Sequence, residues 1–273
     1  MSTVESTPAA AAAAPRRRWT FGRPLQVLLV RFGAIALILL AWLEVGRRTD
    51  PVLFTTPTAV ASAAWTMVAS GELWTYLGPS LLVLLYGMLL AVSTGVVIGL
   101  LIARFWPVEV ALSPLITFLY SIPTVALVPL IVMWAGFDTA AKVAILYLFA
   151  FFPVVINTHQ GVRNVDPKLL EVGRAFRCSE AQLWTNIILP AALPFIVTGL
   201  RLALGRGLIG MVLADLYTAI SGIGYLIVRT ANTYQVDRMF VPIVVLGLLG
   251  VALTALLHFV ERRVAPWTMR RSE

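Results

Sequence analysis

Six long apolar stretches, each about long enough to cross a bilayer, constrain this sequence more than any other feature. A membrane-spanning helix needs about 20 mostly apolar residues, and its backbone polar groups must bond within their own segment. The stretches are too evenly apolar for the alternating strands of a membrane barrel. We therefore expect an all-α membrane protein with six transmembrane helices. They are predicted at roughly 27–45, 79–103, 112–134, 140–158, 193–217 and 239–260.

Composition agrees with a chain whose solvent includes lipid. Of its 273 residues, 59% are hydrophobic and 12% are charged, whereas soluble domains carry about 45–50% apolar and about 25% charged residues. The formal net charge of +8 does not indicate nucleic-acid binding, because the arginines lie between apolar blocks and not on a polar domain. Membrane lipid is therefore an expected partner, and nucleic acid is not.

The positions of lysine and arginine predict the orientation of the chain, since cytoplasmic loops are enriched in both. With the N-terminus in the cytoplasm, the outer face holds only Arg47, Arg48, Lys142, Arg229 and Arg238. We therefore expect both termini to be cytoplasmic. The expected organisation is a disordered Ala-rich tail at 1–26, a six-helix membrane domain at 27–262 and a second tail at 263–273.

Groups that could perform chemistry are scarce. The single Cys178 excludes an internal disulfide, and the distant His159 and His258 are interpreted as interfacial or packing residues, not metal ligands. No carboxylate pair or Ser–His–Asp set is evident for catalysis. No phosphate-binding loop accompanies either lysine, Lys142 or Lys168. We predict a protein that is not an enzyme, binds no metal or cofactor, and takes any energy it uses from a partner.

The segment 163–190, on the predicted inner face, carries the signals of two short helices. Asp166 followed by Pro167 is a typical helix start, and Ser179 with Gln182 has the spacing of a capping box. Pro190 is expected to stop the second helix. The predicted helices cover 168–176 and 180–188. Physical reasoning leaves two interpretations open: a hairpin packed beneath its own bundle, or a docking element for another protein.

This segment resembles the EAA loop of ABC importer permeases. That pattern is Glu-Ala-Ala, three residues, Gly, nine residues and Ile-x-Leu-Pro. The matching positions are Glu171, Val172, Gly173, Arg177, Ile187, Leu189 and Pro190, with Val172 and Gly173 in place of the alanines. Arg177 stands where the family has a glycine suited to a left-handed bend, a geometry that costs other residues about 1 kcal/mol. We expect either a bend of different shape here or a bend taken up by Cys178.

Further stretches resemble the sulfonate, taurine and nitrate permease branch of that family. They are residues 55–60, 114–137 and 221–227. The resemblance implies a type I ABC importer permease of MetI-like architecture in a bacterial cytoplasmic membrane. It implies a second permease copy (a homodimer or a heterodimer), two ATPase subunits that bind ATP and Mg, and an extracytoplasmic binding protein that delivers a small solute such as a sulfonate, taurine or nitrate.

Two rival classes are an ion-gradient-driven secondary transporter and a channel subunit. A secondary transporter would usually show internal repeats and paired ionisable residues within the membrane. Neither is clear in this sequence. A channel or purely structural subunit would leave the helical loop at 163–190 without a purpose.

Small residues four apart predict close helix contacts, because packing drives helix association in lipid. The two series are Gly87, Ala91, Gly95, Gly99 and Ala103, and Gly199, Ala203 and Gly207. We expect the first to pack within the chain. The second could equally form an interface between two permeases.

Prolines and charges within the apolar segments are candidates for the pathway or the dimer seam. They are Pro123, Pro129, Arg201, Arg206 and Asp215. The prolines either shape the helix or free backbone groups toward a pathway. Arg206 either helps an anionic solute across or holds helices together through a salt bridge or carbonyl bond.

Overall fold

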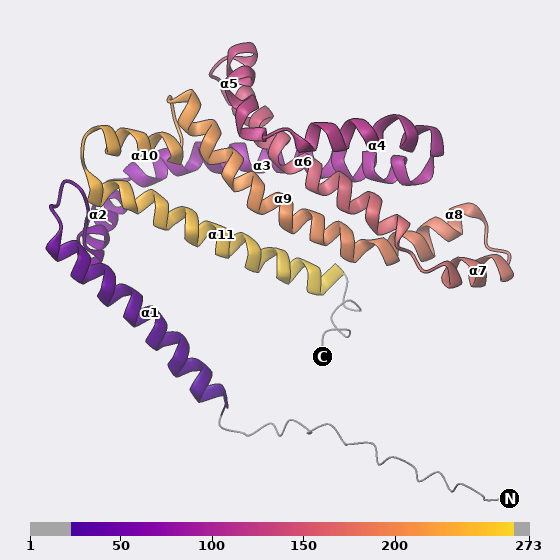
Figure 1. Ribbon diagram of the computed structural model, residues 1–273, viewed down its shortest axis with the longest axis horizontal. Coiled ribbons are helices and arrows are strands. Elements are labelled where there is room, and N and C mark those ends of the chain that lie inside the picture. Colours follow the sequence, from indigo (N-terminus) through magenta and orange to yellow (C-terminus); the bar gives the residue numbers. More distant parts are fainter. Residues whose placement is uncertain (1–22, 265–273) are drawn as a thin grey trace, which may run out of the picture.

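The computed structural model describes residues 23–264, and this part of the chain is helical without strands (Figure 1). The elements are α1 (Arg23–Arg48), α2 (Pro57–Ala69), α3 (Glu72–Arg104), α4 (Trp106–Ser121), α5 (Thr124–Ala135), α6 (Thr139–Arg163), α7 (Pro167–Ala175), α8 (Glu180–Leu183), the π-helix η1 (Trp184–Ile188), α9 (Leu189–Thr218), α10 (Ile223–Asn232) and α11 (Val236–Val264). Helix α1 begins inside the predicted tail at 1–26. The rest of that tail, and nearly all of the tail at 263–273, lie outside the described residues.

The membrane class is confirmed. Among the described residues, five helices are long and apolar enough to span a bilayer, and a bent pair, α4 with α5, makes a sixth if counted as one span. Figure 1 shows α3, α6, α9 and α11 running roughly along one axis, with α2 and α10 near one end and α7 and α8 at the other. Helix α1 leans away from this bundle.

Helix α6 is the centre of the bundle, with α3 and α9 packed against it through small residues. A Cβ added to Gly95 of α3 would lie 2.9 Å from Val154 Cβ, and one added to Gly199 of α9 would lie 2.8 Å from Asn157 Cβ. The expected intrachain role of the α3 series is confirmed. The α9 series, left open by the sequence, also packs within the chain, since Gly207 approaches Met88 and Leu146.

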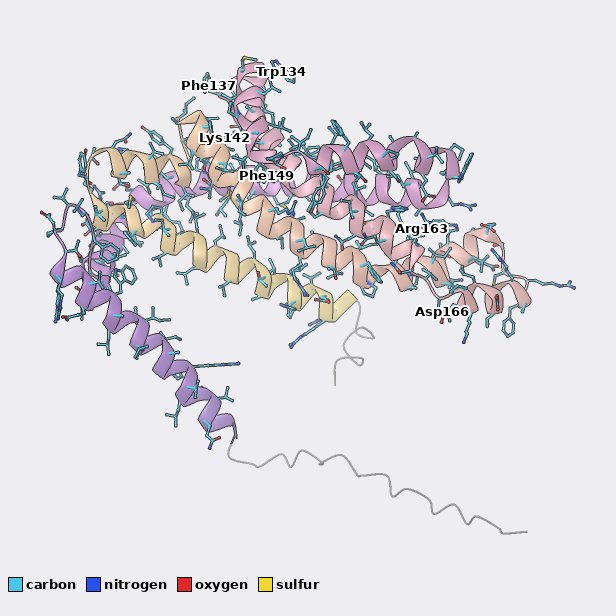
Figure 2. The ribbon with its side chains drawn as sticks, viewed as in Figure 1. Trp134, Phe137, Lys142, Phe149, Arg163 and Asp166 are labelled. Carbon is cyan, nitrogen blue, oxygen red and sulfur yellow. The ribbon has the colours of Figure 1, made fainter. Side chains whose placement is uncertain are left out.

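The prediction of one continuous third helix over 112–134 is wrong. The chain breaks after Ser121, and α4 and α5 meet at 96°. Pro123 explains the break, because a residue before proline is pushed out of the helical region; Ile122 is extended, with ψ 130°. In Figure 2, Trp134 and Phe137 mark the projecting tip of α5, whereas Phe149 lies in the bundle.

The prediction that Pro190 stops the second loop helix is also wrong. Helix α8 continues through η1 into α9, so a helical rod runs from Glu180 to Thr218. Proline in a helix clashes with the carbonyl four residues earlier and cannot donate to it. The wider π turn directly before Pro190 changes the pairing, since the Leu189 N–H reaches back to the carbonyl of Trp184. The segment Glu180–Ile188 is therefore continuous with a membrane helix.

The close contact of α3 with α6 predicts a sharp response to one methyl group. A Cβ at Gly99 would lie 2.7 Å from Thr158 Cβ and 2.9 Å from the Val155 carbonyl oxygen, which cannot move freely. We expect Gly99→Ala to lower unfolding stability in detergent by about 1–3 kcal/mol. Gly247→Ala in α11, where the added atom meets nothing within 4 Å, is the matched control. Equal thermal midpoints for the two variants would contradict this packing.

Candidate functional site

The predicted helical loop forms an elbow, here defined as residues 164–188, at one end of the bundle. The Asp166 carboxylate accepts a hydrogen bond from Lys168 N at 2.9 Å, which starts α7. Ser179 and Gln182 exchange both bonds of a capping box, which starts α8. Both start signals are confirmed. Figure 2 shows Arg163 and Asp166 toward the end of the molecule remote from Lys142.

Arg177 itself makes the bend between α7 and α8. Its φ is +53°, in the left-handed region. The N–H of Cys178 bonds to the Gly173 carbonyl at 3.0 Å, and that of Arg177 bonds to the Arg174 carbonyl at 2.9 Å. These two bonds are the pattern of a Schellman helix end, which places the left-handed residue at position 177. Both expected alternatives, a bend of different shape and a bend taken up by Cys178, are therefore wrong. The bend has the shape that a glycine would adopt, and Arg177 carries the steric cost.

Gly173 lets the two arms of the elbow touch. A Cβ there would lie 2.5 Å from Leu183 Cδ2 and 2.7 Å from Ile187 Cδ1. Leu189 and Pro190 are half-buried where the elbow joins α9. The small residue at the second alanine position thus serves packing within the elbow.

The outward face of α7 is apolar. Leu169, Val172 and Phe176 are 47%, 53% and 81% exposed, and their spacing of three and four residues places them on one face of the helix. Glu171 is also exposed, and the described residues give it no ion-pair partner. Clustered exposed apolar side chains, unlike single ones, mark interaction surfaces. We call Leu169, Val172 and Phe176 the apolar stripe of the elbow.

The elbow is fastened to α3 as well as to α9. Arg104, the last residue of α3, forms an ion pair with Glu180 at 3.2 Å. Its guanidinium also lies over the Trp184 ring, 5.4 Å from the centroid. A displacement of the elbow therefore acts on two of the three central helices.

Arg201 and Arg206, both on α9, lie in different surroundings. Arg201 forms an ion pair with Glu261 of α11 at 2.8 Å, which ties two helices together. Arg206 is exposed and lies over the Tyr120 ring, 4.9 Å from the centroid. Among the described residues no carboxylate pairs with Arg206. Its charge remains available to an anionic partner.

Asp215 lies in the core. Its carboxylate pairs with Lys142 Nζ at 2.8 Å, and the two side chains are 0% and 3% exposed. Ser80 Oγ donates to the same carboxylate at 2.6 Å and accepts from Ile223 N at 2.7 Å. Lys142 also donates to Ser221. A side chain without exposed surface contacts neither solute nor a second copy in this conformation.

The Lys142–Asp215 pair shows that one sequence expectation was wrong. Paired ionisable residues do lie in the apolar segments, although none was evident from the sequence. Lys142, expected on the outer face, is instead buried, and nothing in the sequence indicates the contacts of Ser80 and Ser221 with the pair. The available signal was a lysine within an apolar run, because charge in a membrane segment needs a partner. The pair is sealed from solvent and joins α3, α6, α9 and the 221–224 turn.

The two candidate prolines act on one element. Pro123 is the residue before α5 and lies at the bend, and Pro129 lies inside α5. Both are exposed. They shape the arm that leaves the bundle, and their role in a pathway stays a prediction.

The comparison with known families decides the class. Residues 95–266 match the family described as binding-protein-dependent transport system inner membrane component. The chain belongs to this family. It is 34% identical, over 85% of both chains, to the putative aliphatic sulfonates transport permease protein SsuC of Bacillus subtilis (strain 168). It is 29% identical to the taurine transport system permease protein TauC of Escherichia coli (strain K12), over 92% of this chain and 94% of that one.

A solved structure supports the fold independently. A chain of the MetNI methionine ABC transporter in an inward-facing conformation superposes with a TM-score of 0.55 at 18% identity, over 70% of this chain and 95% of that one. The chain is thus an ABC transporter permease of MetI-like architecture, and a transport subunit. The EAA resemblance places its family motif on the elbow.

The strained bend predicts a stabilising substitution. Arg177→Gly removes the clash of a left-handed Cβ, whereas Arg177→Ala removes the same charge and keeps that clash. We expect amide hydrogen exchange in α7 to be about fivefold slower in Arg177→Gly than in Arg177→Ala, corresponding to about 1 kcal/mol. Equal exchange in the two variants would show that the bend carries no strain.

The buried pair predicts a non-additive mutant cycle. Lys142→Met or Asp215→Leu alone leaves one buried charge without its partner, which costs about 3–5 kcal/mol. The double variant removes both charges and should recover most of this loss. Thermal unfolding of the purified protein measures the cycle. Additive losses in the double variant would mean that the two charges do not depend on each other.

Proposed function

We propose that the chain is the membrane subunit of an ATP-driven importer and takes its driving force through the elbow. The observation that carries this proposal is the exposed apolar stripe on α7, at the family's EAA position and outside the bundle. Three apolar side chains facing water are stabilised when a partner covers them. The proposed partner is an ATPase subunit, which would bind the ATP and Mg.

The geometry supports a lever mechanism. The rod from α8 through η1 to α9 connects the elbow to the full depth of the bundle, and Arg104 connects it to α3. Closure of a pair of ATPases would tilt these helices as a rigid body. The Lys142–Asp215 pair joins α6 and α9 at the end of the bundle remote from the elbow. The tilt would therefore reach that end without separating these two helices.

The assembly follows from the same placement. We propose a second permease copy, a homodimer in the simplest case, two ATPases on the elbows and a substrate-binding protein at the α2 and α10 end. The elbow then lies in the cytoplasm of a bacterium and both termini are cytoplasmic, in keeping with the lysine and arginine distribution. The solute is proposed to be a sulfonate, taurine, nitrate or a similar small solute, because the relatives described above are named as aliphatic sulfonate and taurine permeases.

Substitution of the stripe tests this proposal. Phe176→Asp places a charge where an apolar ATPase contact is expected and should abolish ATP-dependent uptake and co-purification of the ATPase. The matched control is Arg174→Ala, on the opposite face of α7, which should retain both. Solute uptake by the protein reconstituted in vesicles, with ATP supplied inside or outside, measures the coupling of transport to ATP.

The rival transport classes give different results in the same vesicles. A secondary transporter would take up solute when the ion gradient is intact and ATP is absent, and a channel subunit would conduct without either. Uptake that survives ionophores and stops without ATP supports the proposed function. Full activity of Phe176→Asp would refute the elbow as the coupling site.

A further inference from the structure

An open groove of about 310 Å³ lies between α3, α9 and α11, and none of the features described above uses it. Its walls consist of leucine, valine and methionine side chains, among them Leu85 of α3, Leu204 of α9 and Leu256 of α11. Leu85 and Leu256 are 53% and 58% exposed, whereas Met88 at the base of the groove is buried. The groove therefore opens on the surface of the bundle, where lipid is the expected solvent.

The groove is elongated along the helices. It follows α11 from Leu253 to Val260, a length of about 10 Å at 1.5 Å per residue. On α3 it reaches only the middle of the helix, at Leu85 and Val92, whereas on α11 it ends close to the last turn. Figure 1 shows α11 ending on the elbow's side of the bundle. The groove therefore runs from the middle of the membrane domain toward the membrane surface on that side.

The end of the groove near the membrane surface is positively charged. Arg262 and Arg263 lie in the last turn of α11, directly after the groove, and both are exposed. Within residues 23–264 neither of them forms an ion pair. Glu261 is an acidic group at this end, but Arg201 lies 2.8 Å from its carboxylate and neutralises the charge. Two cationic side chains therefore remain for an anionic partner.

The shape of the groove fits a single flexible chain better than another helix. Helices in lipid associate where small residues let their backbones approach. The small residues Gly95 of α3 and Gly199 of α9 contact α6 inside the bundle, and Gly207 approaches Met88 and Leu146. The groove is walled by large side chains instead, which leave a long and narrow space. An acyl chain has this shape and matches the apolar walls.

We propose that this groove, together with Arg262 and Arg263, is a binding site for one anionic glycerophospholipid of the phosphatidylglycerol type. One acyl chain lies in the groove, and the phosphate lies against the two arginines. Basic side chains at the membrane end of a pocket between helices favour anionic head groups. The groove alone would accept the chain of any phospholipid, so the arginine pair confers the selectivity. The site is separate from the solute pathway and from the elbow.

Native mass spectrometry of the full-length chain in detergent tests the site. Phosphatidylglycerol and zwitterionic phosphatidylcholine with identical acyl chains are titrated separately. We expect the first phosphatidylglycerol to bind about tenfold more tightly, as for a charge-assisted contact. The double variant Arg262→Gln, Arg263→Gln should remove this difference. Arg47→Gln, Arg48→Gln is the matched control, because these arginines are also adjacent and exposed in the last turn of a long apolar helix.

A second set of variants tests the groove itself. Leu256→Trp places a larger side chain in the groove and should weaken binding of both lipids. Val251→Trp is the control, because Val251 is 70% exposed on the same helix and does not line the groove. Competition on the wild-type chain gives an independent measurement that needs no variant. Lysophosphatidylglycerol, with one acyl chain, should displace phosphatidylglycerol, whereas glycerol 3-phosphate, without a chain, should not.

Equal affinity for the two lipids, equal effects of the two arginine pairs, or displacement by glycerol 3-phosphate would each overturn the site. Disulfide crosslinking of Leu256→Cys between two chains, in a Cys178→Ser background, would place a second copy in the groove and would also overturn it. None of these measurements involves ATP or solute. Failure of the lipid site is therefore separable from failure of the proposed import function.

Discussion

The close contact of α3 and α9 with α6 is the interaction on which the other features depend. In a bilayer, lipid tails solvate apolar side chains as well as other helices do, so helices associate where small residues let backbones approach. Gly95 and Gly199 reach α6 from two sides. The buried Lys142–Asp215 pair adds a demand for register, since a shift of either helix would leave a charge unpaired in a dry environment. These three helices therefore form one rigid unit.

The parts outside this unit are attached more weakly and carry the contacts expected to change. Helix α4 buries none of its residues fully, and the apolar stripe of the elbow projects from the bundle. The elbow keeps its own shape through the Schellman turn and the Gly173 contact. We therefore expect it to move as a rigid body. A stiff elbow attached to this rigid unit transmits a displacement along the whole length of the helices, whereas a flexible loop would not.

Local signals in the sequence predicted much of this structure. The caps at Asp166 and Ser179 and the small-residue series of α3 depend on neighbours within a few positions, so the sequence specifies them. The left-handed conformation of Arg177 was not predicted, because the intrinsic preference of arginine disfavours it. Prolines show the limit: Pro123 breaks a helix and Pro190 does not, because the outcome depends on whether the preceding turn can widen. The Lys142–Asp215 pair joins residues far apart in sequence, and only the packing of helices brings them together.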